Sequence, residues 1–452
     1  MALTPRKPHF ITTFALFIGC SLMLGGTASG AEKQSFIRDT EIENTIREYA
    51  APLLRAAGIE GDAFHIHIVK SPVLNAFVSR GQRMFVTTGL LRRTENAGQL
   101  LGVMAHEMGH ISGGHLARMQ GVVENASTAA IATQIIGIAL GVLAGEPGAA
   151  VAIGSGGQQV AQRSLLSFSR GVEQSADRAG VSFLDRAGYS SRGMLEFLEI
   201  LSGQDLLQSD RQDAYVQTHP LTRDRIAFVS HHVEASPLSN RRAPEKFERL
   251  HARMVAKLNG FLDPPSVTLQ RYPADDKSVP ARYARSVALF ELANIDEGLP
   301  LIDGLIADYP RDPYFHELKG QLLFESGRLA PALEAYREAV RLLPDAPLLR
   351  TSIAHVELEM GRDDLLDDAL AHLKEALRAD RFIPLGWHLA GTAYGRKGDM
   401  GHASWALAEY NLLLGRKPQA AAMADRALRL LKQGEPAWIR AQDIKQQTDR
   451  KG

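Results

Sequence analysis

The feature that most constrains this chain is the pentapeptide His106-Glu107-Met108-Gly109-His110, which has the pattern H-E-x-x-H. It follows the apolar run 100–105, which is typical of a buried helix. On a helix, positions i and i+4 lie on one face, so two imidazoles there can reach one Zn²⁺. Glu107 projects beside them and can take a proton from a metal-bound water. The pattern therefore predicts a zinc hydrolase site, although a surface helix with two chance histidines would show the same letters.

A third metal ligand is predicted in the segment 168–201, which contains the pattern E-x-x-A-D at residues 173–177. Glu173 and Asp177 are one helical turn apart, so they share a face. Glu173 can complete a His₂Glu ligand set and leave the fourth position for water or substrate. Asp177 would accept the outer N–H of a ligand imidazole, that of His106, and so fix its tautomer. Without the preceding histidines the same spacing would indicate only a solvated helix face.

Another class of zinc protease takes its third ligand from the longer pattern H-E-x-x-H-x-x-G-x-x-H. Gly113 fits that pattern, but the position of the third histidine is occupied by Leu116. His115 is one residue out of register. We therefore exclude that class and expect His115 to be a capping or surface residue.

His219 and Arg225 are further candidates for the site. His219 precedes Pro220, which favours an extended conformation at a loop tip. His219 could donate to the tetrahedral oxyanion, or it could occupy the open zinc position and keep an enzyme latent. Arg225 could stabilise the same negative charge or position a carboxylate. In isolation, the segment would be interpreted as an ordinary surface loop.

Short strands are predicted before the metal helix. Spacing of apolar residues predicts an amphipathic helix over 36–57, and alternation predicts strands over 64–69 and 84–88 with a turn at 79–82. In zinc proteases an edge strand near the metal binds the peptide through main-chain hydrogen bonds. We assign that role to Asn75, Ala76 and Phe77, with a plain structural hairpin as the alternative.

The first thirty residues have the organisation of a secretory signal peptide. Basic Arg6 and Lys7 precede an apolar stretch over 10–26 and small residues over 27–31. An uncleaved membrane anchor is the alternative. Cys20, the single cysteine, lies within this stretch, so the mature chain is expected to contain no disulfide.

The segment 129–153 is apolar apart from a central turn, but its runs are too short to span a bilayer. It is either a buried helical hairpin or a flap that could make peripheral contact with a membrane or a partner. The chain has 51 Lys and Arg against 51 Asp and Glu. This balance argues against nucleic-acid binding.

The C-terminal part repeats. Gly320, Ala332 and Tyr336 follow the small and large spacing of a tetratricopeptide repeat, and Pro310 and Pro344 are 34 residues apart. Such helical pairs stack into concave protein-binding surfaces, while an unrelated helical bundle is the alternative. We therefore expect a signal peptide over 1–30, a peptidase domain over 31–235, a connector over 236–278 and repeats over 279–452.

In combination, these motifs resemble the zinc peptidase family that includes HtpX and the CAAX prenyl proteases, and most of all its periplasmic branch, the beta-barrel assembly-enhancing proteases. The resemblance implies that His106, His110 and Glu173 bind zinc, that Glu107 is the general base and that His219 lies near the metal. It also implies quality control of outer-membrane proteins and their assembly machinery. The absence of cysteine from the mature chain departs from that branch. The matching motifs are 75–77, 87–90, 106–110, 173–177 and 219–226.

The expected fold is mainly α: an α+β zincin-type domain with a small β-sheet, followed by an α-solenoid of tetratricopeptide repeats. The expected function is that of a periplasmic metalloendopeptidase with one Zn²⁺ per chain, which cleaves misfolded or stalled proteins. Protein clients and the outer-membrane assembly machinery would bind to the repeats. The alternative is a chaperone-like assembly factor that acts through its repeats while its zinc site stays largely latent.

Overall fold

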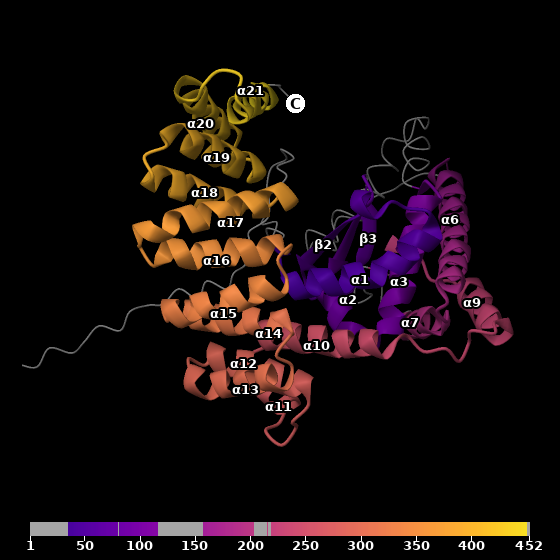
Figure 1. The fold of residues 1–452 in the computed structure, drawn as a ribbon. Helices are drawn as coiled ribbons and strands as arrows, with labels where there is room; N and C mark the ends of the chain where they lie inside the picture. The colour runs from indigo at the N-terminus through magenta and orange to yellow at the C-terminus, as the bar shows by residue number, and fades with distance from the viewer. Residues whose placement is uncertain (1–34, 80, 116–156, 203–214, 216–217, 450–452) are drawn as a thin grey trace, which may run out of the picture.

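The computed structural model describes residues 35–79, 81–115, 157–202, 215 and 218–449. The predicted signal peptide and the apolar segment 129–153 lie outside these ranges. The described chain forms two bodies: an N-terminal one with a small sheet, and a stack of antiparallel helices (Figure 1). This arrangement confirms the predicted fold class.

The N-terminal body contains four strands and the helices that pack around them. Its elements are β1 (Ser35–Ile37), α1 (Thr40–Ala57), η1 (Gly61–Ala63), β2 (His65–Lys70), β3 (Ala76–Ser79), β4 (Arg83–Thr87), α2 (Thr88–Arg93), α3 (Ala97–Ser112), α6 (Gly157–Ala187), α7 (Arg192–Ser202) and α9 (Arg223–Ala235).

Two helices connect this body to the stack, which consists of five helical pairs. The connecting helices are α10 (Glu245–Leu262) and α11 (Pro265–Arg271). The stack comprises α12 (Val279–Glu291), α13 (Ile295–Asp308), α14 (Pro313–Glu325), α15 (Leu329–Leu342), α16 (Pro347–Glu359), η4 (Asp363–Leu365), α17 (Leu366–Ala379), α18 (Pro384–Arg396), α19 (Met400–Leu413), α20 (Lys417–Leu430) and α21 (Pro436–Asp449).

The sheet has the strand order β1-β2-β4-β3, so β3 is an edge strand. β2 and β4 are parallel, whereas β1 and β3 pair antiparallel with their neighbours. The prediction of one helix over 36–57 is wrong at its start, because Phe36 pairs with Val69 in β1. The helix begins only after Asp39, whose side chain accepts a hydrogen bond from the Ile42 N–H at 2.9 Å. An aspartate in this position satisfies one of the free N–H groups of the first turn.

Helix α3 lies at the centre of the N-terminal body and packs against α1, α6, α7 and β3. The Asn96 side chain caps it by accepting from the Gln99 N–H at 2.9 Å. The close crossing with α6 depends on Gly109, since a Cβ there would lie 2.6 Å from the Ala176 carbonyl oxygen. The small residues of the two motifs therefore bring the H-E-x-x-H and E-x-x-A-D segments together.

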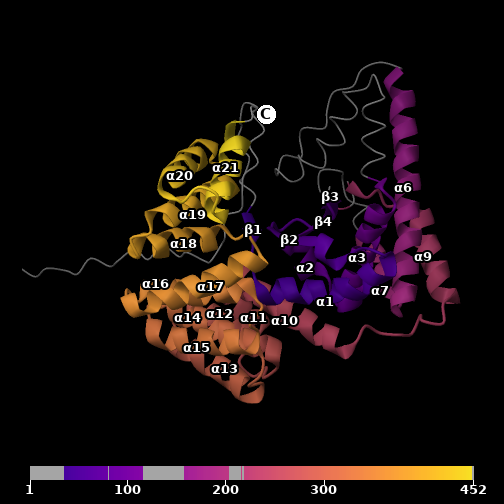
Figure 2. The same ribbon diagram turned by 45° about the horizontal axis from the view of Figure 1, so that its top comes forward.

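The predicted connector is a packed structural element. Helix α10 contacts α1, α2 and α3 on one side and α12 on the other. Its buried Lys257 ammonium lies 2.7 Å from an Asp39 carboxylate oxygen, and the Arg253 guanidinium lies 2.5 Å from an Asp312 oxygen. Both cations also pair with Glu41, which is 1% exposed. The N-terminal end of α1 thus lies against the first repeats in both ribbon views (Figures 1 and 2).

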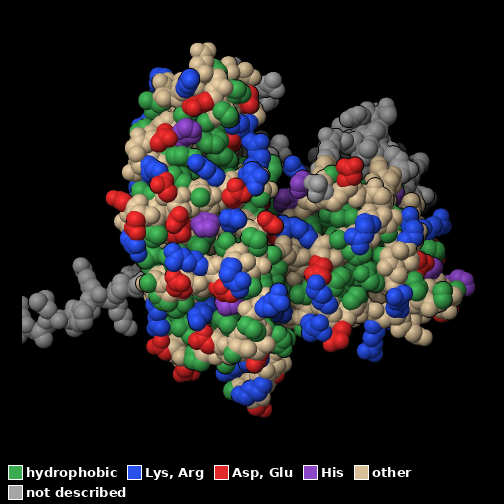
Figure 3. Space-filling view, in the orientation of Figure 1, with side chains coloured by type: hydrophobic (Ala, Val, Ile, Leu, Met, Phe, Trp, Pro, Cys, Tyr) green, Lys and Arg blue, Asp and Glu red, His purple; other side chains and the backbone are tan. Residues whose placement is uncertain are grey.

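Packing within the repeats follows the small and large residues of the motif. A Cβ at Gly320 on α14 would lie 2.8 Å from the Tyr336 ring on α15, so the glycine makes room for the ring. On the face in Figure 3, cationic and anionic side chains are interspersed over both bodies. Within the described ranges, no helix is both long and apolar enough to cross a membrane.

Candidate metal centre

Four buried side chains meet where α3, α6 and the residues before α9 converge. His106, His110, Glu173 and His219 each offer one ligand atom, and these atoms all lie within 4.8 Å of one another. The two α3 imidazoles approach through their Nε2 atoms at 3.1 Å. Glu173 Oε2 lies 3.3 Å from His106 Nε2, and Glu173 Oε1 lies 3.4 Å from His110 Nε2. Nitrogen and carboxylate donors that converge in this way are able to hold a metal ion.

The charge state of the cluster suits a metal. Burial and the neighbouring His106 lower the pKa of His110 well below its usual value, so His110 is neutral and able to bind. Burial opposes ionisation of Glu173, but His219 and His106 outweigh it and hold the Glu173 pKa well below normal. The cluster therefore offers one anionic and at least one neutral ligand near neutral pH.

Glu107 lies beside this cluster with a carboxylate that is buried and has no hydrogen-bond partner within the described part of the chain. His219 Nε2 lies 3.4 Å from Glu107 Oε1. A buried carboxylate without partners is costly, and a water held between the metal and Glu107 would supply one. Burial raises the pKa of Glu107, which favours acceptance of a proton. The donor set and this free carboxylate together fit a metal that activates water.

Asp177 and Arg225 lie on the Nδ1 side of the His106 ring. Asp177 Oδ1 accepts from His106 Nδ1 at 2.8 Å, which leaves Nε2 directed at the cluster. Arg225 is 1% exposed and donates to both Asp177 oxygens, at 2.6 and 2.9 Å. Its Nη1 also lies 3.0 Å from Glu173 Oε2. Arg225 thus contacts two carboxylates of the site.

His115 is buried against the second imidazole, so the expectation of a capping or surface residue is wrong. Its Nδ1 lies 3.1 Å from His110 Nδ1, where it can accept the proton that a metal-binding His110 carries on Nδ1. The chain turns back after α3 at Gly114, whose φ is +61°. A Cβ at Gly113 would lie 2.4 Å from the His115 ring. The two glycines are the sequence signal for this contact, because they end the helix and bring His115 back.

His219 is the fourth member of the cluster and contacts two of the others. Its Nδ1 is 3.3 Å from Glu173 Oε2 and 3.4 Å from His106 Nε2. Tyr215, a residue without a predicted role, stacks on the His219 ring with centroids 4.6 Å apart. Its position four residues before His219 is a helical-turn signal that could have identified it.

The predicted substrate strand lies at the edge of the sheet. Ala76 and Phe77 belong to β3, and Asn75 immediately precedes it. The Asn75 carbonyl accepts from the Thr87 N–H at 3.0 Å. The Asn75 side-chain oxygen is buried and has no hydrogen-bond partner within the described residues. Edge strands of this kind can pair with an added peptide strand.

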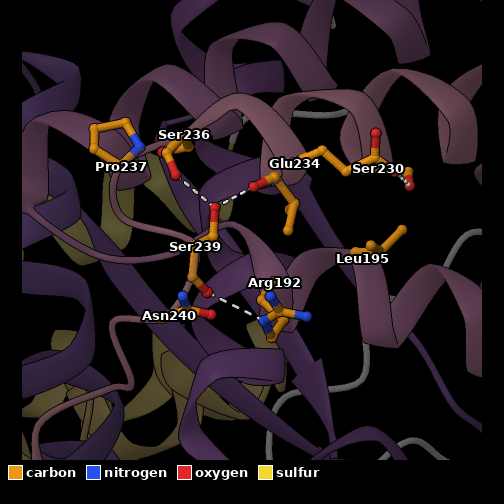
Figure 4. Close-up of a pocket in the computed structure, with 9 residues that line it drawn as sticks. Arg192, Leu195, Ser230, Glu234, Ser236, Pro237, Ser239 and Asn240 are labelled. Carbon is orange, nitrogen blue, oxygen red and sulfur yellow. Dashed lines mark hydrogen bonds between the residues drawn. The ribbon is translucent and has the colours of Figure 1, made fainter.

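A separate hollow of about 530 Å³ opens between α7, α9 and the loop that follows α9 (Figure 4). Its lining includes Arg192 and Glu234, and the Arg192 Nε donates to the Ser239 carbonyl at 3.1 Å. None of the four clustered metal-site residues lines it. This hollow is therefore separate from the cluster.

Comparison with known proteins agrees with this geometry. Residues 37–233 match peptidase family M48, and residues 283–347 match a tetratricopeptide repeat. The chain is 27% identical over 390 residues to the beta-barrel assembly-enhancing protease of Yersinia pestis. The alignment covers 82% of this chain and 76% of the relative.

Two further relatives match different shares of the chain. The beta-barrel assembly-enhancing protease of Escherichia coli K12 is 26% identical over 402 residues, or 88% of this chain and 81% of the relative. The human mitochondrial metalloendopeptidase OMA1 is 27% identical over 183 residues, or 38% of this chain and 33% of the relative. The buried cluster and these matches lead to one conclusion: residues 37–233 form a metallopeptidase domain that matches family M48, and tetratricopeptide repeats follow it.

Proposed function

We propose that this chain is a periplasmic zinc endopeptidase that cleaves misfolded or stalled proteins during outer-membrane protein assembly. The observation that carries the proposal is the buried cluster of His106, His110 and Glu173 beside the unpartnered carboxylate of Glu107. The role in assembly is supported by the names of the bacterial relatives. The periplasmic location is supported by the signal-like sequence of residues 1–30.

In this proposal His106, His110 and Glu173 hold the metal, and Asp177 keeps the His106 ring oriented. When bound, Zn²⁺ supplies a Lewis acid that polarises the scissile carbonyl and acidifies water. Glu107 accepts the proton of the attacking water and returns it to the leaving amine. The raised pKa of Glu107 suits both halves of this transfer. Measurement of metal content, with X-ray absorption to identify the ligand atoms, tests the choice of zinc.

Arg225 is proposed as a positioning residue, because its ion pairs go to the carboxylates of Asp177 and Glu173. It would thereby hold the ligand set together rather than contact the developing oxyanion. Replacement by lysine keeps the charge but loses the paired contact with Asp177. We expect Arg225→Lys to weaken zinc binding more strongly than it changes the pH dependence of hydrolysis.

His219 is proposed to close the resting site, because it completes the group of four ligand atoms and contacts Glu107. We therefore expect His219→Ala to raise the rate at which an unfolded protein is cleaved. Unchanged or lower activity in a folded, zinc-loaded variant would instead favour a contact with the oxyanion. Rates should be compared at equal zinc occupancy, since His219 could also contribute to metal retention.

A second function, a chaperone-like assembly factor with a largely latent site, is favoured by the same closed arrangement. Glu107→Gln separates the two functions, because it removes the base while leaving the three metal ligands. We expect peptide hydrolysis to fall by about 10²–10⁴-fold. Glu95→Gln, an exposed change just before α3, is the matched control. If Glu107→Gln supports client maturation as well as the wild type does, the chaperone function is the correct one.

A further inference from the structure

One face of the sheet carries a row of aromatic side chains, formed by Phe36, His67, Phe77 and Phe85. Strand register places His67 of β2 and Phe77 of β3 on either side of Phe85 of β4. The rings of Phe77 and His67 each stack on the Phe85 ring with centroids 4.8 Å apart. Phe36 of β1 meets the His67 ring edge-on at 6.1 Å. All four side chains are partly exposed, so this aromatic row lies across the outward face of the sheet.

The core of the N-terminal body does not account for the aromatic row. Ile68, Met84 and Val86 project from the opposite face of the sheet and are at most 1% exposed in the core. The outward face of such a sheet normally carries polar side chains, and a contiguous apolar patch there marks a binding surface. The His67 Nε2 atom is buried and has no hydrogen-bond partner within the described ranges. A bound molecule would supply that partner.

Positive charge surrounds the aromatic row. Burial, followed by the charges of Arg83 and Arg38, lowers the pKa of His67 to about 4. The row itself is therefore uncharged near neutral pH, and the potential around it favours an anionic group. Arg38 is held there by the repeats, since it pairs with Asp380 at 2.7 Å. Arg83 is exposed at the start of β4, where a carboxylate on a bound molecule can reach it.

The aromatic row extends from the predicted substrate strand towards the repeats. Phe77 lies in the edge strand β3. At the other end of the row, Arg38 follows β1 and donates to the Phe382 carbonyl at 3.2 Å. Phe382 belongs to the loop between α17 and α18 and is 59% exposed. In both ribbon views the sheet lies beside these two helices, so a chain that crosses the row would meet the repeats at one end and β3 at the other (Figures 1 and 2).

From these observations we propose that the aromatic row is a docking surface for an extended segment of an unfolded client that carries aromatic side chains beside carboxylates. The rings of the segment stack on the row, a carboxylate pairs with Arg83, and a backbone group forms a hydrogen bond with His67 Nε2. The inference rests on the proposed function, because it names the part of a client that is held next to the peptidase site. Phe85 and Arg83 thereby become specificity-determining residues that do not contact the reacting atoms.

Full-length, zinc-loaded Glu107→Gln protein provides the binding test, because it leaves a docked peptide intact. Three fluorescent ten-residue peptides serve as probes: one alternates Phe and Asp, one has Leu in place of Phe, and one has Asn in place of Asp. Anisotropy should show that the Phe and Asp peptide binds most tightly, with roughly a two- to tenfold loss when Leu replaces Phe. Adding Arg83→Gln should weaken binding of that peptide by about two- to fivefold and leave the Asn peptide unchanged.

Substitution of Phe85 tests the aromatic row itself. Phe85→Leu should abolish the preference for Phe over Leu in the peptide, whereas Phe85→Tyr keeps the ring and should retain it. Phe228→Leu on α9 and Arg242→Gln in the loop after α9 are matched controls outside the sheet and should bind all three peptides as the parent does. In the cleaving enzyme, Phe85→Leu should raise KM for the Phe and Asp peptide and leave kcat unchanged, because Phe85 is not part of the metal cluster.

The outcomes separate the docking surface from the proposed function. Loss of the Phe preference in Phe85→Leu, together with the charge effect of Arg83→Gln, would support the docking surface. Equal affinities for the three peptides, or an unchanged preference in a folded Phe85→Leu protein, would overturn it while the peptidase function stands. A change of molecular mass in light scattering of Phe85→Leu would assign the row to contact between copies of this chain and would also overturn it. Selective binding without hydrolysis by the zinc-loaded wild type would instead overturn the peptidase function and leave the docking surface.

Discussion

Replacing Asp177 with asparagine should weaken zinc binding, and should weaken it more at pH 9 than at pH 7. The Asp177 carboxylate accepts from His106 Nδ1 at 2.8 Å and receives two hydrogen bonds from Arg225. Asparagine has one acceptor oxygen, so it cannot serve His106 and both Arg225 donors. Loss of such an outer partner typically lowers metal affinity by about 10–100-fold, or about 1.4–2.7 kcal/mol.

The pH dependence comes from proton competition at His106. Burial disfavours the charged imidazole, but the hydrogen bonds to Asp177 and Glu173 outweigh it and raise the His106 pKa to about 9. Zinc must displace this proton, so wild-type affinity rises by about tenfold per pH unit until the pKa is reached. Asp177→Asn lowers that pKa, so the gain with pH ends sooner in the variant. The affinity gap therefore widens between pH 7 and pH 9.

The assay is a competition titration against a chelator of known affinity at several pH values, with circular dichroism to verify the fold. Asp185→Asn is the matched control on the same helix, because Asp185 contacts an imidazole of its own, that of His232, at 2.9 Å. Asp185 is 34% exposed and distant from the cluster, so its affinity curve should match that of the wild type. A folded Asp177→Asn protein with wild-type affinity at both pH 7 and pH 9 would refute the reasoning.

Three other substitutions test neighbouring features. Gly109→Ala should lower the free energy of unfolding by about 1–3 kcal/mol, because the new Cβ would lie 2.6 Å from a backbone oxygen of α6. Gly171→Ala is the control and should leave stability unchanged, because the space around Gly171 is open. Equal thermal midpoints for the two variants would contradict this prediction. His115→Phe should lower zinc affinity by about tenfold, because the adjacent ligand imidazole loses its acceptor, and His115→Gln should recover part of it in the same titration. Burial raises the pKa of Glu317 to about 8, so the folded chain keeps a proton that the unfolded chain releases above about 4.5, and stability falls between these values. The thermal midpoint of Glu317→Gln should exceed that of the wild type by a margin that grows from pH 5 to pH 8, whereas a constant margin would count against this reasoning.

Much of the metal centre could be predicted because its geometry repeats locally. His106 and His110 share a helical face by spacing alone, and Glu173 and Asp177 do the same on their helix. The structure brings these four side chains together. The link between the two helices was inferred from the ligands that a metal requires, since no local signal connects α3 with α6.

The features that were missed depend on contacts made only in the folded chain. Register on a regular helix predicts no role for His115 beside His110, but the chain leaves the helix at Gly113 and turns back. Phe36 has helical apolar spacing, yet pairing with β2 places it in a strand. The predicted connector contains Lys257 and Arg253, and no local pattern shows that they are buried, because the cost of burying them is offset only by their tertiary partners.

The buried ion pairs around α10 have a geometric consequence for proteolysis. Lys257 and Arg253 fix α1, the helix that packs against the metal helix, to the base of the repeat stack. The repeats and the metal cluster are thereby held at a fixed distance from each other. A client anchored on the repeats would be cut at a position measured from its anchor, and its local sequence would matter less. Inserting one repeat between the anchor and α10 would then move the cut along the client.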